Sequence, residues 1–426
     1  MIVKETDVDF IGSIPVHWEV VPVKYFSTFR MGQTILKEDL IENGKFPVYS
    51  ATEKDHYFGS INNPQFILDE GDIVIPARGN SIGHIKLVHE KAVSTQTTIA
   101  NFVDQDKVSS KFLFYFYKAF RENLFPYDNT AIPQITVEKI KDNKVALPPI
   151  SEQTQIADFL DRKTAQIDNI IAKKEKMLTL LDEKKKAVIN EAVTKGLNPN
   201  AKMKDSGIEW IGEIPENWEV KKLKYIIEVL TDFTANGSFG DLAKNVDYLD
   251  EGHSRLVRLT DLRVDFENTG IYVSEEAHKY LSKSELFGGE LLLANVGAYA
   301  GLACLMPSIG IPATLGPNMF LIKFIEGINS KYVYYNFLSK YLHEQLLAKS
   351  ISSAQPKLNK DDVRSCEILT CEINEQNEII VFIDVQLQKI ENIVQKISFQ
   401  IEKLKEYRQS LISEVVTGKI DAKNYN

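Results

Sequence analysis

The sequence has few cysteines and lacks a long hydrophobic run. Its three cysteines, Cys304, Cys366 and Cys371, are an odd number without CxxC spacing, which excludes a disulfide framework and a zinc site. We therefore predict buried free thiols. The longest apolar stretch, KFLFYFYKAF at 111–120, is far shorter than the roughly 20 residues that span a bilayer. The N-terminal MIVKETDVDF carries acids where a signal peptide needs basic residues and an apolar core, so we expect a cytoplasmic protein with no membrane contact.

Signatures of catalysis and of cofactor binding are also missing. The element NPQF at 63–66 is like the NPPF of adenine methyltransferases, which grips a flipped base, but it lacks the second proline and follows no glycine-rich loop. Gly418-Lys419 has none of the glycine spacing of a phosphate-binding loop. His84 and His89 have no clear third metal ligand. We predict no catalytic residue, no metal and no cofactor in this chain.

Composition and charge fit a multidomain soluble protein. With 44% hydrophobic and 26% charged residues, a 426-residue chain has enough apolar material for two to four domains. The 59 acidic residues outnumber the 50 basic ones, for a net charge of −9. That balance argues mildly against non-specific coating of nucleic acid, and it leaves room for binding through local basic patches.

The sequence repeats itself. DVDFIGSIPVHWEV at 7–20 matches GIEWIGEIPENWEV at 207–220, an offset of 200 that also brings Lys24-Tyr25 onto Lys224-Tyr225. ISEQTQIADFLD at 150–161 matches INEQNEIIVFID at 373–384, now with an offset of 223. Between these flanks the halves hardly resemble one another. The pattern predicts a tandem duplication in which a constant frame carries two different inserts.

The constant frame is predicted to be helical. We expect helices to start at Ser151 and at Asn374 and to stop before the glycines Gly196 and Gly418. Lys174, Lys185 and Arg408 interrupt the apolar pattern, and their aliphatic stems can lie along it. Apolar residues recur at steps of three and four over about five heptads, the pattern of a coiled-coil seam. The seam residues are Leu160, Ile167, Ile171, Leu178, Leu181, Val188 and Ala192 in the first helix, and Ile383, Leu387, Ile390, Val394, Ile397, Ile401, Leu404, Leu411 and Val415 in the second.

Each such helix would be roughly 65 Å long at 1.5 Å per residue. We predict that they pair antiparallel, since this lets each end return to its own insert. The alternative is two separate helices that dock on separate partners.

The inserts are predicted to be mixed. The first has short β-rich runs at 66–68, 72–75 and 97–102 and an aromatic helix at 111–123. The second has strands near 255–259, 290–294 and 318–324, followed by an aromatic helix at 331–347. The predicted fold class is therefore α+β, with two mixed domains that alternate with two long helices in a pseudo-twofold duplication. The expected boundaries are 1–149 and 199–372 for the domains, and 150–198 and 373–426 for the helices.

Taken together, these elements resemble the specificity subunit of type I restriction–modification systems. IGSIPVHWEV and IGEIPENWEV open each half, LPPISEQTQIADFLD and INEQNEIIVFID start the helices, and EAVTKGL and EVVTGKI end them. The resemblance covers essentially the full length. The second copy departs from it slightly, because Asn374 replaces the serine and no prolines precede it.

The resemblance implies a non-catalytic, DNA-binding subunit with two target recognition domains. Each would read one half of a split, asymmetric site in double-stranded DNA, and the helices would set the gap. Two modification subunits would dock along the helices and methylate adenine at N6 with S-adenosylmethionine. Two restriction subunits would add ATP-driven translocation and cleavage, so S-adenosylmethionine, ATP and Mg would belong to partner subunits.

Reading bases requires side chains that make paired hydrogen bonds to base edges, chiefly Arg or Lys on guanine and Asn or Gln on adenine. We expect such residues on loops beside strands, where glycines allow close backbone approach. Each one has the alternative role of an ordinary turn or solvated surface residue. The candidates in the first domain are Arg78, Asn80, Ser81, Gln96, Thr97, Tyr127, Asn129 and Gln134. Those in the second are Arg255, Arg258, Arg263, Asn295, Tyr299, Gln355 and Lys357.

Two other functions compete with DNA reading. One is a coiled-coil scaffold whose domains bind peptides, and salt-sensitive, sequence-dependent DNA binding would separate it from the first hypothesis. The other is an enzyme with its own methyltransferase activity, which the missing glycine-rich loop argues against.

Overall fold

The structure is a computed structural model that describes residues 2–52, 56–127, 133–208, 211–264, 266, 269–350 and 356–422. Its internal contacts divide the chain into two compact units. The first unit comprises residues 1–176 and 397–426, and the second comprises residues 177–396. Because each long helix contributes to both units, the units are described one at a time.

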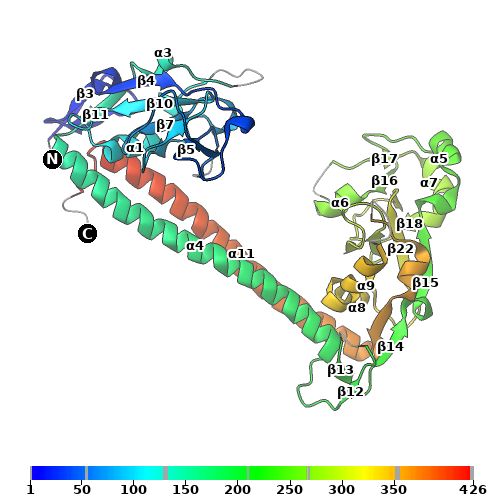
Figure 1. The fold of residues 1–426 in the computed structure, drawn as a ribbon. Coiled ribbons are helices and arrows are strands. Elements are labelled where there is room, and N and C mark those ends of the chain that lie inside the picture. Colours follow the sequence, from blue (N-terminus) through cyan, green and yellow to red (C-terminus); the bar gives the residue numbers. More distant parts are fainter. Residues whose placement is uncertain are drawn as a thin grey trace. The chain divides into compact units, whose positions relative to one another are not determined.

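The two long helices are α4 (Ile150–Lys195) and α11 (Ile373–Val416), and they run side by side in Figure 1. In the first unit, Lys174 Nζ donates to Gln400 Oε1 at 2.6 Å, and Arg408 pairs with Asp168. In the second unit, Lys185 Nζ lies 3.8 Å from a carboxylate oxygen of Glu391. Residue numbers rise along one helix as they fall along the other, so the predicted antiparallel pairing is confirmed and separate docking of the helices is contradicted.

The seam between the helices has an apolar centre. Lys174, Lys185 and Arg408 lie along it half-buried, and their charged ends reach across to the facing helix. The predicted seam residues are buried or half-buried. Those that are buried are Leu160, Ile167, Ile171, Ala192, Ile383, Ile390, Ile397, Ile401, Leu411 and Val415. Those that are half-buried are Leu178, Leu181, Val188, Leu387, Val394 and Leu404.

The helix starts differ from the sequence prediction. Both Ser151 and Asn374 lie inside the first turn, because the helices begin one residue earlier than predicted, at Ile150 and Ile373. At the start of α4 the carbonyl of Pro149 accepts hydrogen bonds from the amides of Glu152 and Gln153, at 2.8 and 3.0 Å. The predicted helix stops are confirmed, since Gly196 and Gly418 both have a φ of +70°.

The first unit contains a four-stranded antiparallel sheet of order β4-β10-β7-β8 and a smaller mixed sheet of order β6-β5-β9. Helices α1, α2 and α3 and two short strand pairs complete the unit (Figure 1). The sheet strands are β4 (Ser27–Met31), β10 (Thr98–Val103), β7 (Ile73–Pro76), β8 (Lys86–Leu87), β6 (Gly59–Ile61), β5 (Phe46–Tyr49) and β9 (Val93–Ser94). The helices are α1 (Ser110–Ala119), α2 (Arg121–Leu124) and α3 (Val137–Ile140), and the pairs join β1 (Val3–Glu5) to β2 (Ser13–Pro15) and β3 (Glu19–Pro22) to β11 (Lys144–Leu147).

The second unit has the same plan. Its two sheets have the orders β15-β22-β19-β20 and β17-β16-β21-β18. The strands are β15 (Ile227–Asp232), β22 (Met319–Phe324), β19 (Leu291–Ala294), β20 (Ala303–Leu305), β17 (Tyr272–Val273), β16 (Ser254–Val257), β21 (Ala313–Leu315) and β18 (Glu285–Leu286). Pairs β12 (Met203–Asp205) with β13 (Glu213–Pro215) and β14 (Glu219–Lys222) with β23 (Glu367–Thr370) complete it. The helices are α5 (Phe239–Asn245), α6 (Leu259–Arg263), α7 (Glu275–Tyr280), α8 (Ser330–Leu338), α9 (Lys340–Ser350) and α10 (Lys360–Ser365).

The two inserts are therefore variants of one topology, although their sequences hardly match. In both, the smaller sheet contains a parallel strand pair, β5 with β9 and β16 with β21. The offset between equivalent strands grows from 200 at Ser27 and Ile227 to 218 at Ile73 and Leu291, and reaches 221 at Thr98 and Met319. Most of the extra length of the second insert thus lies between β15 and β19, where α5, α6 and α7 are found. The predicted α+β fold class with tandem duplication is confirmed.

Individual elements were predicted with mixed success. The strands expected at 72–75, 97–102, 255–259, 290–294 and 318–324 correspond to β7, β10, β16, β19 and β22. The run at 66–68 is not a strand and contributes only an isolated bridge from Leu68 to Ala92. The aromatic helices are each broken into two, at Phe120 and at Ser339. None of the described helices is both long and apolar enough to span a membrane.

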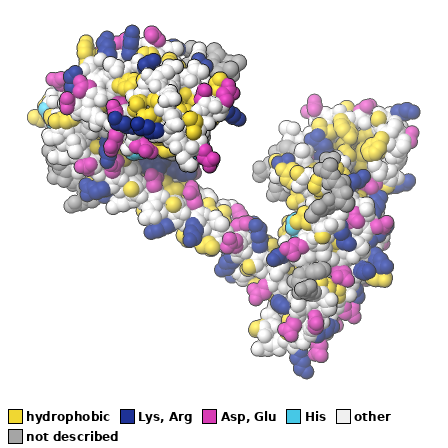
Figure 2. All heavy atoms as spheres, in the orientation of Figure 1, with side chains coloured by type: hydrophobic (Ala, Val, Ile, Leu, Met, Phe, Trp, Pro, Cys, Tyr) yellow, Lys and Arg dark blue, Asp and Glu magenta, His cyan; other side chains and the backbone are white. Residues whose placement is uncertain are grey.

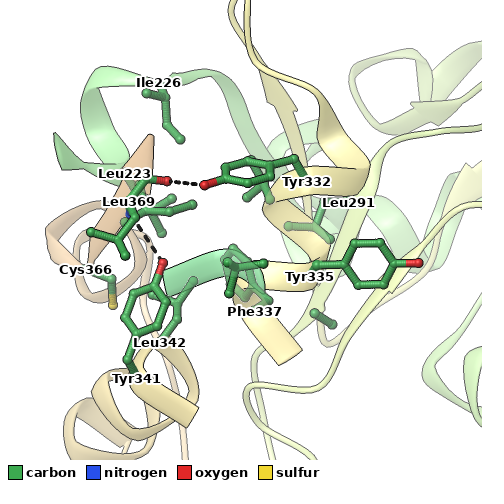
Figure 3. Close-up of a cluster of buried hydrophobic side chains, with 14 of the residues drawn as sticks. Leu223, Ile226, Leu291, Tyr332, Tyr335, Phe337, Tyr341, Leu342, Cys366 and Leu369 are labelled. Carbon is green, nitrogen blue, oxygen red and sulfur yellow. Dashed lines mark hydrogen bonds between the residues drawn. The ribbon is translucent and has the colours of Figure 1, made fainter. Parts of the chain in front are cut away.

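One hydrophobic cluster of the second unit includes residues of the strand β23 (Figure 3). The hydroxyl of Tyr332 donates to the carbonyl of Leu369 at 3.1 Å, and the amide of Leu369 donates to the hydroxyl of Tyr341 at 3.2 Å. Cys366 is fully buried in this core, and burial raises the pKa of its thiol to about 11. None of the three cysteines forms a disulfide; Cys366 is fully buried as predicted, whereas Cys304 and Cys371 are half-buried.

A buried glutamine joins each long helix to the domain that precedes it. Gln153 Nε2 donates to the Pro148 carbonyl at 2.8 Å, and its Oε1 accepts from the Ser109 amide, at the start of α1, at 2.7 Å. Gln376 makes the same contacts in the second unit, donating to the Cys371 carbonyl at 2.8 Å and accepting from the Asn329 amide at 2.9 Å. The glutamine of the SEQ and NEQ elements is thus a connector between helix and domain.

An aspartate two turns along each helix makes a second connection. Asp161 accepts from Tyr115 at 2.7 Å and from Lys111 at 2.6 Å, both on α1. Asp384 accepts in the same way from Tyr335 and Lys331 on α8. Burial raises the pKa of both tyrosines, and the aspartates raise it further, so the phenols remain protonated donors at neutral pH.

Replacement of the second glutamine tests this connection. Gln376→Ala would leave the Asn329 amide and the Cys371 and Gly327 carbonyls without their side-chain partner in a buried site. We expect the free energy of unfolding of the second unit to fall by about 2–4 kcal/mol, since each buried group left unpaired costs about 1–3 kcal/mol. Urea unfolding followed by circular dichroism measures the loss, and hydrogen exchange at 327–331 shows where it arises.

Glu378→Ala is the matched control, because Glu378 is exposed on the same turn of α11. It should change the free energy of unfolding by no more than about 0.5 kcal/mol. Equal losses for the two variants would show that Gln376 has no special role.

Candidate nucleic-acid interface

The loop that follows β7 is held in a tight, glycine-dependent shape. Gly79 and Gly83 have φ values of +73° and +70°, which side-chain-bearing residues rarely adopt. The Gly83 amide closes the loop by donating to the Pro76 carbonyl at 3.0 Å. Arg78 and Asn80 extend from this loop and are exposed, whereas Ser81 is only 7% exposed. The predicted candidates on this loop therefore divide into two that reach solvent and one that does not.

Two further segments flank this loop. The Ala77 amide donates to the Thr97 carbonyl at 2.9 Å, and the Ile135 amide donates to the Ala77 carbonyl at 3.0 Å. The Gly79 amide donates to the Pro133 carbonyl at 3.1 Å, and Arg78 forms a β-bridge with Gln134. Backbone hydrogen bonds thus bring three segments that contain predicted DNA-contacting residues together, at the end of β7 and the start of β10.

The second unit repeats this arrangement bond for bond. The Gly301 amide donates to the Ala294 carbonyl at 2.9 Å, and Gly297 and Gly301 have φ values of +85° and +92°. The Asn295 amide donates to the Asn318 carbonyl at 3.1 Å, and the Leu358 amide donates to the Asn295 carbonyl at 2.9 Å. We call this shared set of backbone bonds the loop frame, which comprises 76–83, 97 and 133–135 in the first unit and 294–301, 318 and 356–358 in the second.

The side chains that the two loop frames present are different. Counted from equivalent glycines, Arg78, Asn80 and Ser81 of the first frame correspond to Val296, Ala298 and Tyr299 of the second. Val296 forms a β-bridge with Lys357, an exposed residue of the neighbouring segment 356–358. The same backbone therefore carries a polar set in one unit and a largely apolar set in the other.

The remaining candidates of the first unit have distinct surroundings. Gln96 is half-buried, and its Oε1 accepts from the Ile35 amide at 3.1 Å, so it holds the segment after β4. Thr97 is half-buried, with its hydroxyl 2.8 Å from that of Thr95. Tyr127 is 51% exposed. Asn129 and, in the second unit, Gln355 lie outside the described residues.

The arginine cluster of the second unit is spread between core and surface. Arg255 is only 7% exposed, its guanidinium lies 3.4 Å from Asp261, and it stacks on Phe266 at 5.1 Å. The structure therefore gives Arg255 a role inside the domain, contrary to the expectation that it lies on the DNA-reading surface. Arg258 is half-buried, and Arg263 is exposed at the end of α6.

Arg263 lies against the second loop frame. Its guanidinium carbon is 4.3 Å from the ring centroid of Tyr299, which is 41% exposed. Asn295, at the other end of the same loop, lines a cleft of about 600 Å³ together with Asn318 and Lys357. The structure thus brings four predicted residues of the second domain, Asn295, Tyr299, Arg263 and Lys357, to one loop frame.

Sequence analysis missed the residues that support the loops from within. Arg121 of α2 donates through Nε to the Ile82 carbonyl at 2.9 Å and contacts His84 at 2.9 Å, which braces the inner side of the first loop. Lys86 is 2% exposed and donates to Thr52 Oγ1 at 2.7 Å, which fixes the segment after β5. No sequence motif marks either residue, because both act through backbone groups or hydroxyls far away in the chain.

The face shown in Figure 2 carries charges of both signs. On the face shown in Figure 2, Lys and Arg side chains are interspersed with Asp and Glu side chains in each unit. The described residues include no group of three His, Cys, Asp or Glu side chains that could hold a metal ion.

Solved structures share this fold. One, described as "Structural basis underlying complex assembly and conformational transition of the type I R-M system", aligns with a TM-score of 0.70 at 13% identity and covers 96% of this chain and 99% of the other. The crystal structure of the HsdS subunit from Thermoanaerobacter tengcongensis aligns with a TM-score of 0.53 at 14% identity, covering 96% and 98%. Two mixed domains with two long helices are thus an architecture found in type I restriction–modification proteins.

The sequence gives the family. Residues 15–179 and 215–403 match the family of the type I restriction modification DNA specificity domain, and the chain belongs to this family. The type I restriction enzyme MjaVIII specificity subunit of Methanocaldococcus jannaschii is 25% identical over 97% of this chain and 95% of that protein. The EcoKI specificity subunit of Escherichia coli (strain K12) is 21% identical over 96% and 91%. The predicted relationship to type I specificity subunits is confirmed.

The exposed arginine of the first loop frame provides a test of base reading. Arg78→Ala should reduce discrimination at one base position by about 1–3 kcal/mol, the value of a paired hydrogen bond to a base edge. Arg78→Lys should lose most of this discrimination too, since lysine keeps the charge but lacks the planar fork. Binding competition between DNA duplexes that differ at single positions measures it. A loss that is uniform over all sequences in Arg78→Ala and is restored in Arg78→Lys would make Arg78 a phosphate contact.

Proposed function

We propose that this chain is the sequence-specific DNA-binding subunit of a type I restriction–modification complex, and that each domain reads one half of a bipartite, asymmetric site. The observation that carries the proposal is the pair of loop frames, which share their backbone hydrogen bonds and differ in their side chains. Equal frames place side chains in equal positions, and unequal side chains select different bases. The recognition domains would comprise residues 1–149 and 199–372, and the helical segments 150–198 and 373–426.

The chain itself would be non-catalytic. Catalysis would come from modification subunits that methylate adenine at N6 with S-adenosylmethionine and, through them, from restriction subunits that use ATP and Mg. Two subunits of each kind would bind, together with double-stranded DNA. The proposed location of this assembly is the cytoplasm.

The long helices would set the gap between the half-sites. α4 is one continuous helix of 46 residues, about 69 Å at 1.5 Å per residue. Its apolar seam with α11 restrains bending, and a helix of fixed length defines a fixed number of base pairs. The support for this part of the proposal is the paired seam, which a flexible linker would not need.

An exposed tyrosine occurs in both copies of the repeated sequence that flanks the inserts. Its presence in both copies supports the binding of two copies of one partner protein. Tyr25 and Tyr225 are both 64% exposed, on short turns that follow β3 and β14. In each, the preceding lysine lies over the ring, at 5.8 Å for Lys24 and 4.7 Å for Lys224. A surface that differs between the domains suits two DNA half-sites, whereas a surface that is equal in both suits two copies of one protein. We assign this Lys-Tyr pair to the docking of the modification subunits.

The docking assignment predicts a specific loss. Tyr25→Ala combined with Tyr225→Ala should weaken capture of the modification subunit by at least 10-fold, because exposed tyrosines are frequent binding hot spots. Pull-down of the co-expressed subunit with the full chain measures this. Tyr127→Ala, which removes an exposed tyrosine from a predicted DNA loop, is the matched control and should leave capture unchanged. Undiminished capture by the double variant would contradict the assignment.

The proposed function is tested by long-read mapping of adenine methylation in cells that express the complex, with and without this gene. Loss of one split, asymmetric motif on deletion would establish the specificity role and would reveal both half-sites. A continuous motif would contradict reading by two separate domains. Unchanged methylation in a strain that contains the active partner subunits would favour the scaffold alternative, in which purified chain shows no salt-sensitive preference among DNA sequences.

A further inference from the structure

The loop frame of the second domain lacks the arginine that the first one carries. Val296 stands where the first frame has Arg78, and Ala298 stands where it has Asn80. Valine and alanine cannot donate hydrogen bonds to a base edge, although they can contact the methyl group of thymine. Within this frame the exposed Lys357 can recognise guanine as a cation, but the frame contains no arginine that could do so with a planar pair of donors.

Helix α6 supplies an arginine to this frame from another part of the chain. Arg263, the last residue of α6, places its guanidinium carbon 4.3 Å from the ring centroid of Tyr299. Both side chains are exposed, and Tyr299 belongs to the loop between Gly297 and Gly301. The helix lies in the connection between β16 and β17, which in the first unit, between β5 and β6, contains no α-helix among its described residues.

Contacts of the buried Asp261 hold α6 in place. Asp261 is fully buried, accepts from the Arg258 amide at 2.7 Å, and lies 3.4 Å from the buried guanidinium of Arg255. The Asp261 carbonyl also accepts from the Phe266 amide at 2.9 Å. Because α6 is anchored at Asp261, the backbone of Arg263, two residues further on, is restrained next to the loop between Gly297 and Gly301.

Stacking prepares the guanidinium for base recognition. The Tyr299 ring next to the guanidinium carbon restricts the positions that the Arg263 side chain can take. A guanidinium restricted in this way can form two parallel hydrogen bonds to guanine O6 and N7 at a lower entropic cost. The stack is itself favourable, and it reduces the side-chain freedom that binding would otherwise remove.

We propose that the pair of Arg263 and Tyr299 recognises a guanine in the second half-site, the role that we predict for Arg78 in the first. This inference rests on the proposed function, since it assumes that the loop frame faces DNA. Recognition of guanine is thus assigned to Arg263, which lies outside the loop frame. Tyr299 is a positioning residue that acts through Arg263.

The test compares four variants of the full chain, each co-expressed with its modification subunit, by mapping methylated sites. Arg263→Ala and Arg263→Lys should both relax one guanine position of one half-site by about 5- to 150-fold, and the other half-site should be unchanged. Tyr299→Phe keeps the ring and should methylate as the wild type does. Tyr299→Leu removes the ring and should relax the same position by a smaller factor.

Arg78→Ala is the matched control, because it should relax the opposite half-site. Circular dichroism and capture of the modification subunit establish that each variant is folded and assembled. Unchanged discrimination in Arg263→Ala, alongside a split motif in the wild type, would overturn this inference and leave the proposed function standing. So would a uniform loss at every position that Arg263→Lys restores, since that result marks a phosphate contact. A wild-type complex without a split motif would overturn the proposed function, and the inference with it.

Discussion

A buried glutamine at the start of each long helix is the interaction on which the rest of the structure depends. Gln153 and Gln376 each bind the backbone on two sides, the last residues before their own helix and the first turn of the aromatic helix α1 or α8. The aspartates Asp161 and Asp384 repeat the connection farther along, through a tyrosine and a lysine. Because these groups, apart from the exposed Lys111, are buried or half-buried and bind one another, substitution of one leaves others unpaired. That cost explains why this part of the chain is the same in both halves while the inserts differ.

The loop frames follow the opposite principle. Their bonds join backbone amides to backbone carbonyls, so the side chains of residues 78, 80 and 81 or of 296, 298 and 299 are not needed to hold the loop. Only the glycines are required, since they adopt positive φ values. A surface whose shape does not depend on its side chains can change its side chains without loss of the fold, which is what a domain that reads different DNA sequences requires.

The ends of the long helices are treated alike in both units, with one difference. Gly196 packs against Trp218, and Gly418 packs against Trp18, so the glycine that stops each helix also makes room for a tryptophan of the IGxIPxxW element. In the second unit Trp218 Nε1 donates to Glu375 at 2.9 Å. In the first unit the equivalent Glu152 contacts His17 at 3.0 Å, and Trp18 Nε1 has no hydrogen-bond partner among the described residues. The packing of tryptophan on glycine is thus common to both units, whereas the hydrogen bond from the indole to the glutamate is present only in the second among the described residues.

Periodicity and repetition in the sequence were sufficient for the architecture. The heptads of residues 160–192 and 383–415 predicted the two helices and favoured their antiparallel pairing, since such patterns reflect local geometry and burial on one face. The glycines Gly196 and Gly418 predicted where the helices stop. The sequence also located the loops that meet in the loop frames. It did not reveal that the two inserts share one topology, because strand order depends on contacts between distant residues that many sequences satisfy. Nor did it separate Arg255, which is buried beside Asp261, from Arg263, which lies exposed on Tyr299. Three arginines within nine positions have the same charge and the same local propensity, and only the packing of α6 against the sheet decides which of them reaches the surface.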